Sequence, residues 1–287
     1  MSIDALGDPT TRTAADLAWS GPLLAGKVVL VTGVVTTESI ACGVARRAID
    51  FGAEVVLTGL ERDLEKARDA AASLGIDTVI SYDATDPEAA DAVVEEIRQR
   101  VGRLDAALHA IAFAPRAALS GDIVGVDPVG LEKAFRTSTV SYAETARILQ
   151  RLAPTSGGSL VGLDFDAAGA WSVYNWMGVC KAGLESLNRY LARDLGKVGI
   201  RSNLVAAGPI HTRAAGGIPG FDELLDAWAE RSPLPWDPHD TEQVADAVCF
   251  LFSDLARAVT GEILHVDAGY HAMAAPLRRA AGRDAES

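Results

Sequence analysis

The chain has 287 residues, 49% of them hydrophobic, and its formal net charge at pH 7 is −13. This acidic balance argues against a nucleic acid or an anionic membrane surface as a partner, because both are bound by basic surfaces. No apolar stretch approaches the length of about 20 residues that crosses a bilayer, and the first residues lack the basic and apolar segments of a secretory signal, so we expect a cytoplasmic protein.

Short, β-branched apolar runs alternate with longer segments of helical periodicity along the chain. The runs are residues 27–33, 54–59, 78–83, 104–113, 159–165, 200–208 and 262–269. Their near-continuous apolar character is typical of strands in a parallel sheet with helices on both faces. The pattern predicts a single doubly wound α/β domain of the Rossmann type over residues 25–272, with a seven-stranded parallel sheet. We expect loosely ordered arms at residues 1–24 and 273–287.

The first run ends in a glycine turn that leads toward a helix. Thr32 and Gly33 are followed by Ser39 at the expected helix start, and the unpaired N–H groups of a helix N-terminus suit phosphate oxygens. The pattern G-x-G-x-x-G is absent, so a plain strand-to-helix turn capped by Ser39 is the alternative. The position at the first β–α junction of a doubly wound sheet favours a dinucleotide diphosphate.

Two further strand ends suit the adenosine half of a dinucleotide. Glu61 would accept a hydrogen bond from a ribose 2′-hydroxyl, whereas the neighbouring Arg62 would contact a 2′-phosphate. An exposed pair at a helix start is the alternative for both. Asp83, after the third run, offers a carboxylate to the nitrogen donors of adenine. We expect NADH, with NADPH as the less favoured cofactor.

Small residues and turns follow the fourth and sixth runs. Ala110 and its neighbours after His109 are small enough to let a cofactor approach the backbone. Gly208 and Pro209 form a turn that would cover a nicotinamide ring, and the Thr212 hydroxyl would be available to a phosphate. Small strand ends and Gly-Pro turns are also common in proteins that bind nothing there.

The segment 210–240 interrupts the alternation of strands and helices. Glycines and prolines flank one short helical piece in it. A surface excursion is one interpretation. We favour a mobile substrate lid, because ligands of open α/β sheets bind outside the carboxyl ends of the strands.

The strongest chemical pattern follows the fifth run, where Tyr174 precedes Lys181 by seven positions. On a helix this spacing is almost two turns, so both side chains are expected to leave one face. An ammonium group beside a phenol lowers the cost of negative charge on the phenol oxygen and can hold ribose hydroxyls. The spacing also arises by chance, so its assignment as a catalytic pair depends on the residues at the surrounding strand ends.

Three motifs resemble the enoyl-[acyl-carrier-protein] reductases of the divergent short-chain dehydrogenase/reductase family. They are GVVTTESIA, DFD followed by YNWMGVCK, and RSNLVAAGPIHT, and the resemblance covers roughly residues 25–272. Ordinary short-chain dehydrogenases carry Tyr-x3-Lys, whereas position 178 here is Gly and the lysine comes later. The actinobacterial members, including the mycobacterial enoyl reductase that isoniazid targets, are the most similar.

The resemblance implies NADH-dependent reduction of the C2=C3 double bond of trans-2-enoyl thioesters of acyl carrier protein or coenzyme A, in type II fatty-acid synthesis or a related acyl pathway. It implies a homotetramer in which Tyr174 hydrogen-bonds the thioester carbonyl, Lys181 holds the nicotinamide ribose and Phe165 packs beside both ligands. The implied cofactor-binding residues are Gly33, Val34, Ser39, Ile40, Leu60, Asp83, Ala84, Ala110, Ile111, Ala112, Lys181, Ala207, Gly208, Pro209, Ile210 and Thr212. The implied substrate pocket consists of Phe113, Trp171, Tyr174 and Met177.

Some positions depart from the family pattern. Ala110 stands where the family usually has serine, which removes a hydroxyl near the diphosphate, so we expect weaker NADH binding. Leu60 replaces an aromatic residue of the mycobacterial members, and Ser172 replaces a proline. The segment after Thr212 is shorter than in the mycobacterial members, which favours acyl chains of medium length.

Two other functions are consistent with parts of the pattern. A short-chain carbonyl reductase would reduce C=O, and a serine about a dozen residues before Tyr174 would support it, but Phe165 and two aspartates occupy that region. A non-catalytic NAD-binding regulator would be expected to lack the tyrosine or the lysine. Cysteine and histidine spacing predicts neither disulfides nor a metal site.

Overall fold

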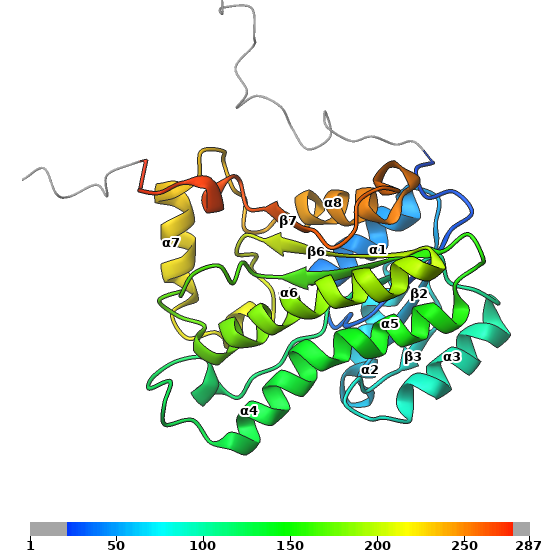
Figure 1. The fold of residues 1–287 in the computed structure, drawn as a ribbon, viewed down its shortest axis with the longest axis horizontal. Helices are drawn as coiled ribbons and strands as arrows, with labels where there is room; N and C mark the ends of the chain where they lie inside the picture. Colours follow the sequence, from blue (N-terminus) through cyan, green and yellow to red (C-terminus); the bar gives the residue numbers. More distant parts are fainter. Residues whose placement is uncertain (1–21, 278–287) are drawn as a thin grey trace, which may run out of the picture.

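The computed structural model describes residues 22–277, which are built around one parallel sheet (Figure 1). Its strands are β1 (Val28–Val31), β2 (Glu54–Gly59), β3 (Val79–Ser81), β4 (Ala106–His109), β5 (Gly158–Asp164), β6 (Ile200–Ala207) and β7 (Ile263–Val266). They lie in the order β3-β2-β1-β4-β5-β6-β7, and every neighbouring pair is parallel. The predicted seven-stranded doubly wound sheet is confirmed.

Helices cover both faces of the sheet (Figure 1). On one face lie α1 (Ile40–Asp50), α2 (Leu64–Ala72) and α8 (Glu242–Phe252), and on the other lie α3 (Ala89–Arg100), α5 (Ser141–Leu152) and α6 (Asn175–Leu195). Alternate side chains of β1 enter the two cores: Val29 and Val31 the first, Val28 and Leu30 the second. All four are buried, which explains why this run is apolar without alternation.

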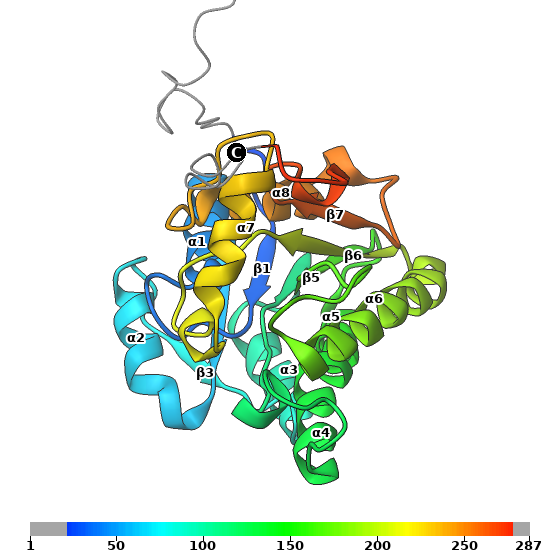
Figure 2. The same cartoon turned by 90° about the vertical axis from the view of Figure 1, so that its left-hand side faces the viewer.

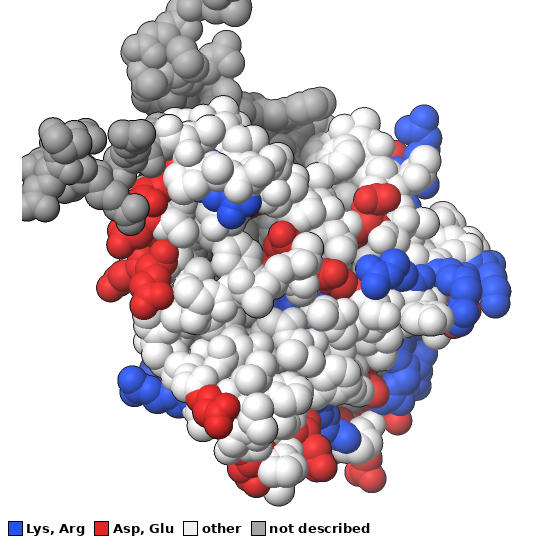
Figure 3. Space-filling view, turned by 60° about the vertical axis from the view of Figure 1, so that its left-hand side comes forward, with Lys and Arg blue, Asp and Glu red and all other residues white. Residues whose placement is uncertain are grey.

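The order of the strands reverses between β1 and β4, and such a switch point opens a crevice at the carboxyl ends of the strands. Helix α7 (Phe221–Arg231), the helical part of the predicted lid segment, extends across this edge of the sheet (Figure 2). On the adjacent face, α4 (Pro128–Phe135) continues through a turn of π-helix, Arg136–Val140, into α5. Figure 3 shows the carboxyl-end side as a largely uncharged surface, with a group of acidic side chains at its left edge and basic side chains at its right edge.

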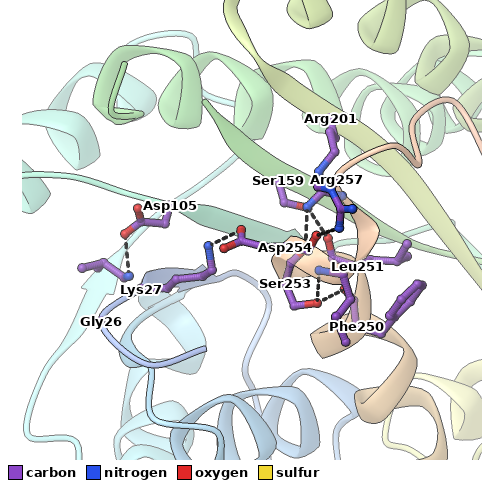
Figure 4. Close-up of polar contacts among 12 residues, drawn as sticks. Gly26, Lys27, Asp105, Ser159, Arg201, Phe250, Leu251, Ser253, Asp254 and Arg257 are labelled. Atoms are coloured by element: carbon purple, nitrogen blue, oxygen red, sulfur yellow. Dashed lines mark hydrogen bonds and ion pairs between the residues drawn. The ribbon is translucent and has the colours of Figure 1, made fainter. Parts of the chain in front are cut away.

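A polar network holds the opposite end of the sheet (Figure 4). The Arg201 guanidinium and the Ser159 hydroxyl both donate to the Leu251 carbonyl, at 2.7 and 2.8 Å. Lys27 pairs with Asp254 at 2.9 Å. The end of α8 is thereby tied to the starts of β1, β5 and β6, so the scaffold is fixed on the side away from the crevice.

The packed part of the chain is longer than the predicted span of 25–272. Leu24, which we placed in the N-terminal arm, is fully buried, and its N–H donates to the Phe51 carbonyl at 2.9 Å. At the other end, the Leu277 N–H donates to the Glu230 carbonyl of α7 at 3.0 Å. The remainder of the two expected arms, residues 1–21 and 278–287, lies outside the described residues. Within residues 22–277, no helix is long and apolar enough to cross a membrane.

Candidate active site

A cleft of about 540 Å³ opens at the carboxyl ends of β1 to β4. Its volume lies in the range of about 300 to 1,000 Å³ that is usual for ligand and cofactor sites. Predicted cofactor residues that line it are Gly33, Val34, Ser39, Ile40, Leu60, Asp83, Ala84, Ala110, Ile111, Ala112, Lys181 and Thr212. Lining residues that sequence reasoning missed include Thr36, Asp63, Lys133, Thr137 and Arg213. The strand ends therefore bring most of the predicted cofactor set into one cavity.

Gly33 lies where the ends of β1 and β4 approach each other most closely. Its φ is +76°, and a Cβ added there would be 2.1 Å from the Ala110 carbonyl oxygen. The Thr32 hydroxyl reinforces the approach, because it accepts from the Ala110 N–H at 3.2 Å and donates to the Leu108 carbonyl at 2.9 Å. Only glycine satisfies both the left-handed backbone and the lack of space.

Ser39 caps the amino terminus of α1. Its Oγ accepts from the Cys42 N–H at 3.1 Å and donates to the Thr36 carbonyl at 2.8 Å. The capping role considered from the sequence is confirmed, and Ser39 also lines the cleft. No acidic residue lies in the first turn of α1, so the positive end of the helix dipole at the cavity wall is available to an anion.

The end of the cleft near β2 holds an acid between two arginines. Asp63 lies 3.2 Å from Arg213 and 3.5 Å from Arg62, and its side chain is 16% exposed. All three residues line the cleft, whereas Glu61 does not. Asp63, and not Glu61, is therefore the acid that lines this end of the cleft, two positions after the residue that the sequence suggested.

Asp83, two residues after β3, lines the same end of the cleft. Its Oδ1 accepts from both the N–H and the hydroxyl of Thr85, at 2.8 and 2.7 Å. Within the described residues its Oδ2 accepts no hydrogen bond, so one carboxylate oxygen has no partner in the protein.

Lys181 extends from α6 to the end of β5. Its Nζ donates to the Leu163 carbonyl at 2.7 Å, and the side chain is buried at the wall of the cleft. Burial lowers the pKa of this ammonium group, and the negative charge of Asp164 opposes the shift. The lysine is thus placed to donate to hydroxyl groups of a molecule in the cleft.

Tyr174 stands just before α6 and not within it. Its φ is 126° and that of Asn175 is 35°, values that are rare for residues with a side chain. Because α6 begins at Asn175, the expectation that one continuous helical face carries both Tyr174 and Lys181 is wrong. The Tyr174 N–H donates to the Leu119 carbonyl at 3.1 Å, which holds the strained turn. Burial raises the pKa of the phenol, so Tyr174 stays a hydrogen-bond donor at neutral pH.

A buried carboxyl that we did not assign from the sequence lies beside these groups. Asp164, the last residue of β5, is 5% exposed, and neither of its oxygens has a hydrogen-bond partner among the described residues. Burial raises its pKa to about 7, and the charge of Lys181 opposes this shift. The charge of Asp164 also raises the pKa of Tyr174, so the three groups are electrostatically coupled. An acid at the end of an apolar run was the only signal in the sequence.

Phe165 brings the predicted catalytic and substrate residues together. Its ring lies 5.0 Å from that of Tyr174 and 4.7 Å from that of Trp171, between centroids. Two aromatic residues that the sequence did not indicate join them: Trp228 of α7 lies 5.8 Å from Phe165 and stacks on Tyr270 at 3.8 Å. The remaining predicted pocket residues, Phe113 and Met177, are not part of this group of rings.

Phe113 lines the cofactor cleft and is 39% exposed. Met177 is buried in a small core with Cys180 and Leu119, and Tyr174 packs against that core. Met177 therefore belongs to the small core against which Tyr174 packs, and Phe113 belongs to the cofactor side of the site.

The turn after β6 is covered by two indoles. The predicted cofactor residues Ala207, Gly208, Pro209 and Ile210 are buried and do not line the cleft. A Cβ on Gly208 would meet both Trp228 and Trp236 at 2.8 Å, and the Trp236 Nε1 donates to the Pro209 carbonyl at 2.8 Å. The turn is therefore packed beneath these two side chains and is not part of the lining of the cleft.

His109, at the end of β4, is a buried neutral side chain. Its Nε2 lies 2.7 Å from the Ser141 Oγ, and burial, together with the charge of Lys181, lowers its pKa to about 3. Over residues 22–277, no group of three or more His, Cys, Asp or Glu side chains is arranged to hold a metal ion.

Comparison with known proteins identifies close relatives over nearly the whole described chain. The family model for enoyl-(acyl carrier protein) reductase matches residues 33–271. The enoyl-[acyl-carrier-protein] reductase [NADH] of Mycolicibacterium smegmatis is 39% identical over 267 residues, which is 86% of this chain and 97% of the relative. The enzyme of the same name from Bacillus cereus is 42% identical over 87% of this chain and 98% of its own length. That from Mycobacterium avium is 36% identical over 86% of this chain and 97% of its own.

Proposed function

Because the chain belongs to the enoyl-[acyl-carrier-protein] reductase family, we propose that it reduces the C2=C3 double bond of trans-2-enoyl thioesters with NADH. The thioester is carried by acyl carrier protein or coenzyme A, and the reaction serves fatty-acid synthesis or a related acyl pathway. One observation carries the proposal: the cofactor cleft ends at Lys181 and Leu163, and two residues further along the chain Phe165 packs on Tyr174.

Three features of the cleft fit a dinucleotide. Its size is that of a cofactor site, the small residues Gly33 and Ala110 line its wall, and the N-terminus of α1 presents N–H groups without a neighbouring acid in its first turn. Asp63 supplies an acceptor at the adenosine end. When bound, NADH supplies the hydride that is transferred to the β-carbon of the enoyl group.

The side chains at the other end of the cleft suit a reaction that places negative charge on an oxygen. The Tyr174 phenol is proposed to donate a hydrogen bond to the thioester carbonyl oxygen while the enolate forms. A preorganised donor of this kind commonly contributes about 10² to 10³ in rate. Lys181 holds the nicotinamide ribose and adds positive charge near the same oxygen, and Phe165 packs beside the reacting carbons. A proton taken from solvent at the α-carbon completes the saturated thioester.

The assembly state is part of the same proposal. Resemblance to the family favours a homotetramer, which light scattering of the purified protein tests directly. A single-chain mass would remove this part of the proposal and leave the chemistry untouched.

The reaction is tested by following NADH oxidation with crotonyl and octenoyl thioesters, each on coenzyme A and on acyl carrier protein. We expect turnover of enoyl thioesters and formation of the saturated product. Turnover of a ketone without turnover of any enoyl thioester would favour a carbonyl reductase. Tight NADH binding with no turnover of either would favour a non-catalytic NAD-binding protein.

A further inference from the structure

Beyond Phe165, the interior beneath α7 is filled by aromatic rings. Phe165 lies 4.7 Å from Trp171 and 5.8 Å from Trp228, and Trp171 lies 5.4 Å from Trp228 and 5.6 Å from Tyr270. The cavity that remains among these rings is about 10 Å³, which is about the room for one water molecule. We call these four residues the aromatic cluster.

The rings of the aromatic cluster are held in place by polar contacts at its edge. Each indole N–H donates to a backbone carbonyl, at 2.7 Å for Trp171 and 3.0 Å for Trp228. The Arg231 guanidinium lies 4.4 Å from the centre of the Tyr270 ring. Trp228 and Tyr270 are also buried. Because the indole N–H groups already have partners, moving a ring costs both packing and hydrogen bonds.

We propose that Trp171, Trp228 and Tyr270 of the aromatic cluster form the end wall of the acyl site and restrict the enzyme to short trans-2-enoyl thioesters. The inference rests on the proposed function, in which the thioester carbonyl reaches the Tyr174 phenol and the acyl chain runs past Phe165. In this arrangement a four-carbon chain would end beside these two residues. A longer chain has to displace a ring that comes from the β5–α6 loop, from α7 or from the segment after β7.

The dependence of binding on acyl-chain length distinguishes a site filled by aromatic rings from an open channel. If the acyl chain entered an open apolar channel, each further methylene would tighten binding about fourfold until the channel was full. A wall of packed rings removes this gain, because the added carbons find no empty volume. The aromatic cluster therefore predicts that kcat/KM falls as the acyl chain becomes longer. The short segment after Thr212, considered alone, favours chains of medium length.

The test compares kcat/KM of the full-length protein for trans-2-butenoyl, trans-2-octenoyl and trans-2-dodecenoyl coenzyme A at saturating NADH. We expect the value to fall at least tenfold from the butenoyl to the dodecenoyl thioester. A dodecenoyl value equal to or above the butenoyl value overturns the end wall and leaves the proposed function intact. Absence of turnover at every length overturns the proposed function itself, which is a different result.

Two variants locate the wall. Tyr270→Ala removes a ring, and Trp171→Leu, at a half-buried position, keeps more of the packing if the first variant does not fold. Either folded variant should raise the ratio of dodecenoyl to butenoyl kcat/KM at least tenfold. Tyr190→Ala, which removes a 58% exposed ring on α6, is the control and should keep the wild-type ratio. Folded Tyr270→Ala and Trp171→Leu variants that keep the wild-type ratio would contradict the proposal.

Discussion

Lys181 joins α6 to β5 by a hydrogen bond of 2.7 Å from its Nζ to the backbone carbonyl oxygen of Leu163. Both residues line the large cleft. The ammonium group is therefore part of the scaffold and part of the proposed cofactor site at once, which makes its removal informative.

Replacing Lys181 with alanine should weaken NADH binding at least tenfold, because a charged donor to the ribose hydroxyls is lost. Calorimetric titration of NADH into the variant measures this effect. Lys197→Ala, with a side chain 75% exposed after α6, is the matched control. Normal NADH affinity together with normal turnover in Lys181→Ala would contradict the assigned role.

Asp63 is expected to set the preference for NADH over NADPH. It pairs with Arg62 and Arg213 at the cleft, so Asp63→Ala leaves two guanidinium groups without their partner and removes the negative charge that repels a 2′-phosphate. The ratio of NADPH to NADH affinity should rise roughly tenfold. Glu61→Ala, which lies outside the lining, should leave the ratio unchanged, and an unchanged ratio in Asp63→Ala would assign the preference elsewhere.

Gly33 and Gly75 give a matched pair of alanine substitutions. Both have positive φ, at +76° and +72°, but a Cβ at Gly33 meets the Ala110 carbonyl at 2.1 Å whereas Gly75 has nothing within 4 Å. Gly75→Ala should lower the free energy of unfolding only by the backbone strain, about 1 kcal/mol. Gly33→Ala should lower it by more than about 3 kcal/mol, because two strand ends must separate. Urea unfolding measures both losses, and equal losses would refute the close-approach argument.

The buried carboxyl of Asp164 should make stability fall with rising pH. Its pKa is raised from 3.8 to about 7 by burial, so at pH values between these the folded state holds a proton that the unfolded state releases. The stabilisation is present at acidic pH and is lost as pH rises toward the folded pKa. Between pH 5 and pH 8 the wild type should lose about 3 kcal/mol more unfolding free energy than Asp164→Asn. Parallel curves for the two proteins would count against the raised pKa.

The sheet and most of the cofactor cleft followed from local sequence patterns. Apolar runs such as 27–33 indicate strands regardless of what they contact, and the carboxyl ends of parallel strands necessarily meet at one edge. Gly33 and Asp83 were therefore predicted correctly to face one cavity, although nothing in a single sequence reports its volume.

The parts that escaped prediction depend on contacts between distant segments. Trp228 and Tyr270 are 42 positions apart and stack only because the chain after β7 returns beneath α7. Tyr174 was expected on a helix because its spacing to Lys181 suits one, but the turn held by Leu119 gives it a positive φ instead. Asp164 was overlooked because burial, and not residue type, makes its carboxyl unusual.

The central claim is that the Tyr174 phenol stabilises charge on the thioester carbonyl during reduction of a carbon–carbon double bond. The most direct measurement is the rate at which wild type and Tyr174→Phe convert trans-2-butenoyl coenzyme A to the saturated thioester at saturating NADH. We predict that the variant binds NADH with wild-type affinity and turns over about 10² to 10³ times more slowly. An equal rate in the variant, or no saturated product from the wild type, would contradict the claim.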